Sequence, residues 1–266
     1  MSWALSLVRA SLRVIRAHRA LVVFPIISGI ASILVIVAVA LPIADQHRLT
    51  PGSWLLIGFG YFLLSLISVF CTAALVHAAN LALRGEPATV AAGLRGAAVR
   101  IDAIVVWALI SCTVSLLLRA LNSIRLGPLV EAVLGVAWQL TTYLVIPLIV
   151  VEGDSVRASL RRSRELLRRT WGTNARGSIG VSVILTVSGL LGVVVLGGIG
   201  VLTGSLAHDA TAGFLISGIT IAAWLVLLSV LGGTISALFR AALYRFAVEG
   251  TTVRQFREFD LSTVFN

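Results

Sequence analysis

Two stripes of arginines are the residues whose type and spacing could bind a charged ligand. Steps of three and four residues place the members of each stripe on one side of a helix. The stripes consist of Arg9, Arg13 and Arg16, and of Arg157, Arg161, Arg164 and Arg168. Because a guanidinium group grips phosphate through two hydrogen bonds at once, we expect both stripes to bind anionic lipid headgroups, the second being also available to an acidic protein partner. The alternative is that these arginines only set topology during membrane insertion.

Four polar side chains inside apolar stretches form a second candidate site. They are His77, Asn80, Gln139 and Thr142. Polar groups are costly in lipid and therefore indicate a ligand or proton site, but hydrogen bonds between helices explain them as well. A continuous polar cavity at Gln139 would favour a transporter or channel for a lipid or small amphiphile.

No combination of residues predicts catalysis. The sequence has no Gly-rich phosphate loop, no nucleophile elbow, no zinc-protease motif and no paired carboxylates inside an apolar stretch. Cys71 and Cys112 are the only cysteines, and both lie in apolar stretches, where thiols behave as small apolar residues. We therefore expect no enzyme activity, no cofactor and no metal.

The elements that must position these residues are six apolar stretches. The chain is 58% hydrophobic and 12% charged, with a mean hydropathy of +1.03, which is too apolar for a water-soluble domain. Runs of about 20 apolar residues match the thickness of a bilayer, where only helices and closed barrels satisfy the backbone. We predict an all-α polytopic membrane protein that forms a single integral membrane domain over residues 1–266. The predicted transmembrane helices cover residues of about 20–43, 54–82, 101–121, 129–151, 178–205 and 213–239.

The basic residues lie almost wholly on one side of these spans. All 21 are arginine, and the net charge is +10. Only Arg48, Arg119 and Arg125 fall beside the three short connections that follow odd-numbered spans, which leaves 18 on the other side. The positive-inside rule then predicts cytoplasmic termini, in a bacterial plasma membrane. Since the charges flank apolar spans, the expected partners are anionic lipids and not nucleic acid.

The chain also predicts three similar units. The segment Val8–Arg13 recurs as Val156–Arg161, and an acidic residue adjoins a hinge glycine after each even-numbered span, at Gly85, Gly153 and Gly250. Chance similarity in a chain rich in Ala, Leu, Val and Arg is the alternative. We predict three pseudo-repeated hairpins, each preceded by a cytoplasmic amphipathic helix. The units cover about 1–84, 85–152 and 153–249, and a cytoplasmic tail follows at 250–266.

Glycines in the fifth span predict close helix packing. Gly200 and Gly204 form a GxxxG pair, and Ser188 with Gly192 is a second pair of small residues four apart. Small residues let helix backbones approach closely. We expect Gly192, Gly200 and Gly204 to contact another span or a second subunit of a homo-oligomer, and a flexible helix used in gating is the alternative.

Short motifs along the chain resemble a family of bacterial six-span membrane proteins of uncharacterised function. The motifs are Phe24-Pro25 with Ser28, Asn80, Gly85 and Pro87, Arg100, Trp107-Ala108-Leu109, Gly135, Trp138 and Pro147, Arg162-Ser163, and Thr170-Trp171-Gly172. The chain is more distantly similar to the membrane domain attached to some glycerophosphodiester phosphodiesterases. The resemblance implies a fold and no reaction, because the phosphodiesterase catalytic domain has no counterpart here.

These features predict a non-enzymatic integral membrane protein, a scaffold or accessory envelope component whose cytoplasmic face binds anionic lipid. A transporter or channel for a lipid or small amphiphile is the alternative. Every acidic residue lies at a span end or in a loop, which weakens the case for ion-coupled transport.

Overall fold

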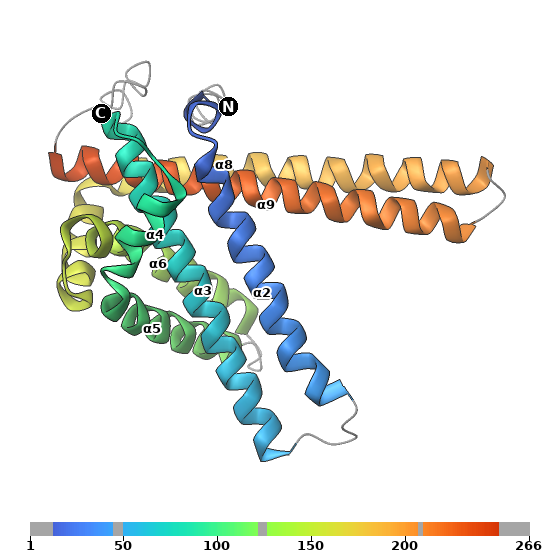
Figure 1. Ribbon diagram of the computed structural model, residues 1–266, viewed down its shortest axis with the longest axis horizontal. Helices are drawn as coiled ribbons and strands as arrows, with labels where there is room; N and C mark the ends of the chain where they lie inside the picture. Colours follow the sequence, from blue (N-terminus) through green and yellow to red (C-terminus); the bar gives the residue numbers. More distant parts are fainter. Residues whose placement is uncertain (1–12, 45–49, 122–126, 207–209, 250–266) are drawn as a thin grey trace.

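The computed structural model describes residues 13–44, 50–121, 127–206 and 210–249, and the elements assigned in these ranges are all helical (Figure 1). Within these ranges the all-α prediction is confirmed. For residues 167–185 only the backbone is described. In chain order the elements are α2 (Ala20–Ala44), α3 (Pro51–Arg84), α4 (Val90–Ala98), α5 (Ile101–Ala120), α6 (Gly127–Thr141), α7 (Val145–Pro147), the π-helix η2 (Leu148–Glu152), α8 (Val156–Leu206) and α9 (Ala210–Glu249).

Five helical segments in the described ranges are long and apolar enough to cross a membrane. They are Ala20–Ala44, Pro51–Arg84, Ile101–Ala120, Thr186–Thr203 within α8, and Gly213–Arg245 within α9. At most 22% of the residues in the apolar window of any one segment are buried inside the protein. Such extensive apolar exposure is typical of a surface that lipid covers. The length and composition of these helices therefore indicate a multi-pass membrane protein.

The predicted fourth span, 129–151, is broken. Its first part, α6, has 15 residues, which a rise of about 1.5 Å per residue extends over about 22 Å, less than the hydrocarbon thickness of about 30 Å. Turn residues 142–144 separate α6 from α7 and η2. Pro147 explains the break, because proline has no N–H for the carbonyl of Tyr143 and its ring clashes with that carbonyl. A sixth continuous span is therefore not confirmed.

The described helices meet at one base (Figure 1). α2 packs on α3, α5 on α6 and α8 on α9, while α3 also contacts α4, α5, α7, η2 and α9. The buried core gathers around the second half of α3, residues 69–83, together with the last part of α9. Away from this base, the α2–α3 and α8–α9 hairpins run in different directions. The protein is thus closely packed at the base, from which these two hairpins extend.

Glycines bring α4 directly against α3 in the base. A Cβ added to Gly93 would lie 2.7 Å from the carbonyl oxygen of Ala74 and would also meet the ring of Phe24. A Cβ on Gly96 would lie 2.6 Å from Cγ of His77. A larger residue at Gly93 would meet the backbone of α3, whereas at Gly96 it would displace the ring of His77.

Two of the predicted hinge glycines end their helices in the left-handed conformation. Gly85 follows α3 with a φ of 80°, and Gly153 follows η2 with a φ of 78°. Glycine adopts this conformation without steric cost, which is why it so often ends helices. The guanidinium of Arg100 fills the space that a Cβ on Gly153 would need. The third predicted hinge, Gly250, lies outside the described residues.

α8 joins two elements that the sequence analysis separated. The amphipathic segment that begins at Val156 and the predicted span at 178–205 belong to one hydrogen-bonded helix, Val156–Leu206. Its ribbon nevertheless changes direction between the first turns and the apolar part near Thr186 (Figure 1). The second unit does begin with a separate short helix, α4. The repeat relationship between the hairpins stays a prediction, and the tail at 250–266 lies outside the described residues.

Candidate functional site

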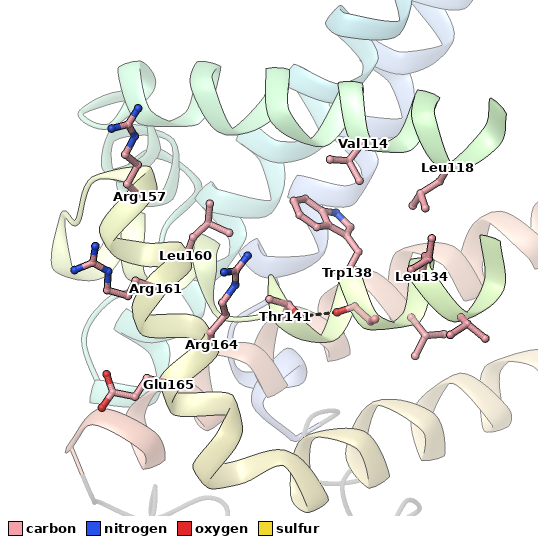
Figure 2. A pocket seen from close by; sticks show the side chains of 13 residues that line it. Val114, Leu118, Leu134, Trp138, Thr141, Arg157, Leu160, Arg161, Arg164 and Glu165 are labelled. Atoms are coloured by element: carbon pink, nitrogen blue, oxygen red, sulfur yellow. Dashed lines mark hydrogen bonds between the residues drawn. The ribbon is translucent and has the colours of Figure 1, made fainter. Parts of the chain in front are cut away.

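A groove of about 1420 Å³ lies between α5, α6 and the first turns of α8 (Figure 2). One wall is apolar and includes Val114 and Leu118 of α5 and Val133, Leu134 and Trp138 of α6. The opposite edge comes from α8 and carries three arginines. We call this cavity the groove, and it combines an apolar wall with a basic edge.

A pair of stacked tryptophans holds the apolar wall in place. The rings of Trp107 on α5 and Trp138 on α6 have centroids 5.9 Å apart and planes inclined by 18°. Trp107 is buried in the base, whereas Trp138 is half-buried and lines the groove. Thr141, at the end of the wall, donates its hydroxyl to the carbonyl of Ala137 at 2.7 Å. Because that hydroxyl is already used, this part of the wall presents mainly carbon to a ligand.

The basic edge consists of Arg157, Arg161 and Arg164, which we call the arginine face. Their spacing puts them on one side of α8, and all three side chains are exposed. Among the described residues, none of the three has an ion pair or hydrogen bond to another side chain. Figure 2 shows Arg164 extending past Leu160 toward the groove, while Arg161 points to the outside. The arginine face is therefore charged and available to a ligand.

Arg162, on a different side of the same helix, is half-buried and paired with carboxylates. It forms an ion pair and hydrogen bond with Glu152 of η2, and its Nη1 lies 3.6 Å from Oδ2 of Asp154. Glu152 also accepts a hydrogen bond of 2.9 Å from the hydroxyl of Tyr244 on α9. We call Glu152, Arg162 and Tyr244 the carboxylate junction. It ties η2, α8 and α9 together.

Small residues on the inward side of α8 complete this attachment. Ser159 and Ser163 are both fully buried. The hydroxyl of Ser163 donates to the carbonyl of Thr141 at 2.7 Å, and so binds α8 to the end of α6. These contacts fix the rotation of α8 about its axis. With its inward side held in this way, the arginine face lies along the groove.

The structure does not bring the four predicted intramembrane polar residues into one site. Asn80 is buried at 3% exposure on α3, with no hydrogen-bond partner for its Oδ1 among the described groups. His77 packs against Gly96, as described above. Gln139 is exposed on α6, and Thr142 donates its hydroxyl to the carbonyl of Trp138 at 2.8 Å. None of the four lines the groove.

The remaining predicted lipid-binding arginines are placed only in part. Arg13 and Arg16 are exposed, in the short helical segment before α2. Arg9 lies outside the described residues, and so does the side chain of Arg168. The structure therefore shows three members of the second stripe together at the groove and two members of the first stripe elsewhere.

Two of the predicted packing glycines lie where α8 approaches α9. A Cβ added to Gly200 would lie 2.9 Å from the carbonyl oxygen of Gly213 and would also meet the side chain of Ser217. A Cβ on Gly192 would meet the indole of Trp224, whose Nε1 donates to the carbonyl of Ser188 at 3.2 Å. The partner in both cases is the other helix of the same hairpin. Nothing is described for the surroundings of Gly204.

The carboxylate junction and the contact between Arg240 and Tyr143 were not predicted from the sequence. Arg240 follows the predicted sixth span, and its guanidinium lies 4.8 Å from the centre of the Tyr143 ring. A cation over an aromatic ring is a stabilising contact. The acid–glycine pattern at Glu152 was the available signal, since a carboxylate held just after a span needs a partner.

A family model described as "Family of unknown function (DUF6159)" matches residues 52–254, which include every element that builds the groove. No curated protein and no solved structure matches the chain.

Proposed function

This chain belongs to that family of unknown function, and we propose that it is a non-enzymatic integral membrane protein of the bacterial envelope, a scaffold or accessory component whose cytoplasmic face binds anionic lipid. The observation that carries the proposal is the contrast on α8 between the engaged Arg162 and the available arginine face. The more distant similarity to the membrane domain of glycerophosphodiester phosphodiesterases stays a prediction and contributes no activity.

Electrostatics supports lipid as the partner of the arginine face. Each arginine near an anionic membrane surface contributes about 1 kcal/mol of attraction, and the effect falls off within a Debye length. A guanidinium also matches phosphate geometry with two parallel hydrogen bonds. Lipid phosphates are the most abundant anions beside a membrane helix. Three available arginines next to an apolar wall therefore favour lipid over a soluble anion.

The proposal requires that the arginine face be cytoplasmic. In a background without Cys71 and Cys112, we expect Arg164→Cys to react with a membrane-impermeant thiol reagent only after cells are opened. Arg48→Cys, in the first predicted outer connection, should react in intact cells. Labelling of Arg164→Cys from outside would reverse the proposed orientation.

Lipid binding itself is tested by changing the arginine face and measuring co-purified lipid. We expect the triple variant Arg157→Gln, Arg161→Gln and Arg164→Gln to retain clearly less anionic phospholipid after mild detergent extraction. A matched control removes the same charge elsewhere on the cytoplasmic side, through Arg95→Gln, Arg254→Gln and Arg257→Gln. An unchanged lipid content in the first triple variant would leave these arginines as insertion signals only.

One observation favours transport as a second candidate function. The break in the predicted fourth span after Thr141 resembles the discontinuous helices that line sites in many transporters. If the protein moves amphiphiles, vesicles that contain it should exchange a fluorescent phospholipid between leaflets faster than protein-free vesicles. Exchange at the protein-free rate would remove this candidate and leave the binding component.

A further inference from the structure

We propose that the groove is a seat for one anionic phospholipid, with its phosphate on the arginine face and an acyl chain along the wall formed by α5 and α6. This inference rests on the proposed function but goes beyond it. A charged surface attracts many exchanging lipids, whereas a seat holds one molecule in a fixed position and requires both of its parts.

The arginine face is short enough to bind a single phosphate group. Arg157 and Arg164 are seven residues apart, which corresponds to about 10 Å along a helix. Arg164 already extends toward the groove, and arginine side chains are long and flexible enough for Arg161, which points outward in Figure 2, to rotate onto the same ligand. Glu165, an acidic residue that lines the groove, already interacts with another group. The edge therefore has a surplus of positive charge.

The apolar wall of the groove offers a binding surface for hydrocarbon, which a free phosphate lacks. Val133 is 62% exposed and Leu134 46% exposed, although both line a concave site. Leu118 of α5 faces the same space. An acyl chain along the wall would cover these side chains with hydrocarbon and pack against them by dispersion contacts. A ligand with an anionic head and an apolar tail fits both parts, whereas an acidic peptide would leave the wall uncovered.

Trp138 marks the boundary between the two parts. Its indole lies on the wall, with the arginine face beside it in Figure 2. Tryptophan prefers the level of the glycerol and headgroups in a bilayer, because its ring is apolar and its N–H is polar. The groove therefore has the same order as a lipid molecule: charge, interface and hydrocarbon.

The experiment uses the full chain in detergent and counts bound lipid by native mass spectrometry. Filling the groove through Val133→Trp should remove the one tightly held anionic lipid and weaken binding of a short-chain phosphatidylglycerol about tenfold. The matched control is Val130→Trp, which adds the same ring to an exposed position of α6 that does not line the groove. It should bind like the parent.

The arginine triple variant should weaken the same binding about 100-fold, from about 1 kcal/mol for each arginine. If the triple variant loses lipid while Val133→Trp binds like the parent, the arginine face attracts lipid but the groove is not its seat, and only this inference is overturned. If neither the triple variant nor Val133→Trp loses lipid, both this inference and the proposed function are overturned. If glycerol phosphate or inorganic phosphate binds as tightly as short-chain phosphatidylglycerol, the ligand is a free anion. This result would also overturn the proposed lipid site.

Discussion

Arginines on two sides of the helix α8 have different roles. Arg162 meets Glu152 and adds to the attachment of three helices, while Arg157, Arg161 and Arg164 lie one face away with no such partner among the described residues. Charge alone does not distinguish them. What differs is whether the fold has placed a carboxylate opposite the side chain, so inward changes should lower stability and outward changes should lower ligand binding.

The largest loss of stability is expected where α8 touches α9 most closely. In Gly200→Leu, the new side chain would collide with Ser217 and with the backbone of Gly213, at a cost of about 2–3 kcal/mol. Gly198→Leu is the control, because nothing lies within 4 Å of a Cβ at Gly198. Thermal unfolding in detergent should show a lower Tm for the first variant alone. Equal melting of the two would remove the contact and favour the gating interpretation of these glycines.

The carboxylate junction should give the next largest effect. Glu152→Ala leaves Arg162 and the hydroxyl of Tyr244 without their shared partner, and we expect a loss of about 1–2 kcal/mol, since Arg162 is partly solvated. Glu86→Ala removes the same charge from an exposed side chain and should melt like the parent. If Glu152→Ala is as stable as Glu86→Ala, the pairing of Arg162 with Glu152 adds no stability. The contrast between Arg162 and the arginine face would then be wrong.

A smaller difference in stability is expected between alanine variants of two buried serines that are one turn apart. Ser163→Ala removes a hydrogen bond of 2.7 Å and should cost about 1 kcal/mol, because the carbonyl of Thr141 loses its donor. Ser159→Ala removes a buried hydroxyl that has no partner among the described groups, so it should be neutral or slightly stabilising. Both changes improve helix propensity equally, which makes the difference between their Tm values the relevant measurement.

The smallest effect on stability belongs to the arginine face. Once lipid has been removed, the free energy of unfolding should differ by at most about 0.5 kcal/mol between the parent and the triple variant Arg157→Gln, Arg161→Gln and Arg164→Gln. Its lipid content, by contrast, should fall. A large loss of stability in lipid-free protein would mean that these arginines hold the fold together, as Arg162 does.

Much of this arrangement follows from the sequence. Hydropathy located the membrane helices because apolar runs of this length have few other uses, and i, i+4, i+7 spacing grouped the second arginine stripe. Gly85 and Gly153 were identifiable because few other residues end a helix with positive φ. These predictions depend only on residues close together in the chain.

The rest depends on contacts between distant segments. A hydropathy profile runs through residues 142–144 without a break, so the fourth span was predicted as one continuous helix over 129–151. Gln139 was chosen for its depth in a span, yet it is exposed, because the rotation of α6 is set by the stack of Trp138 on Trp107. Likewise, spacing kept Arg162 out of the stripe, but the sequence did not identify its partner Glu152, which is ten positions away.

The π-helical turn η2 constrains how the length of this chain can change. A π-turn holds one residue more than an α-turn, and each residue of an α-helix rotates the chain by about 100°. Deleting a single residue within Leu148–Glu152 would restore α-helical register and swing the carboxylate of Glu152 away from Arg162. A one-codon deletion here should therefore lower the yield of folded protein far more than a conservative substitution at the same place, and relatives that shorten this turn would need to move the acid with it.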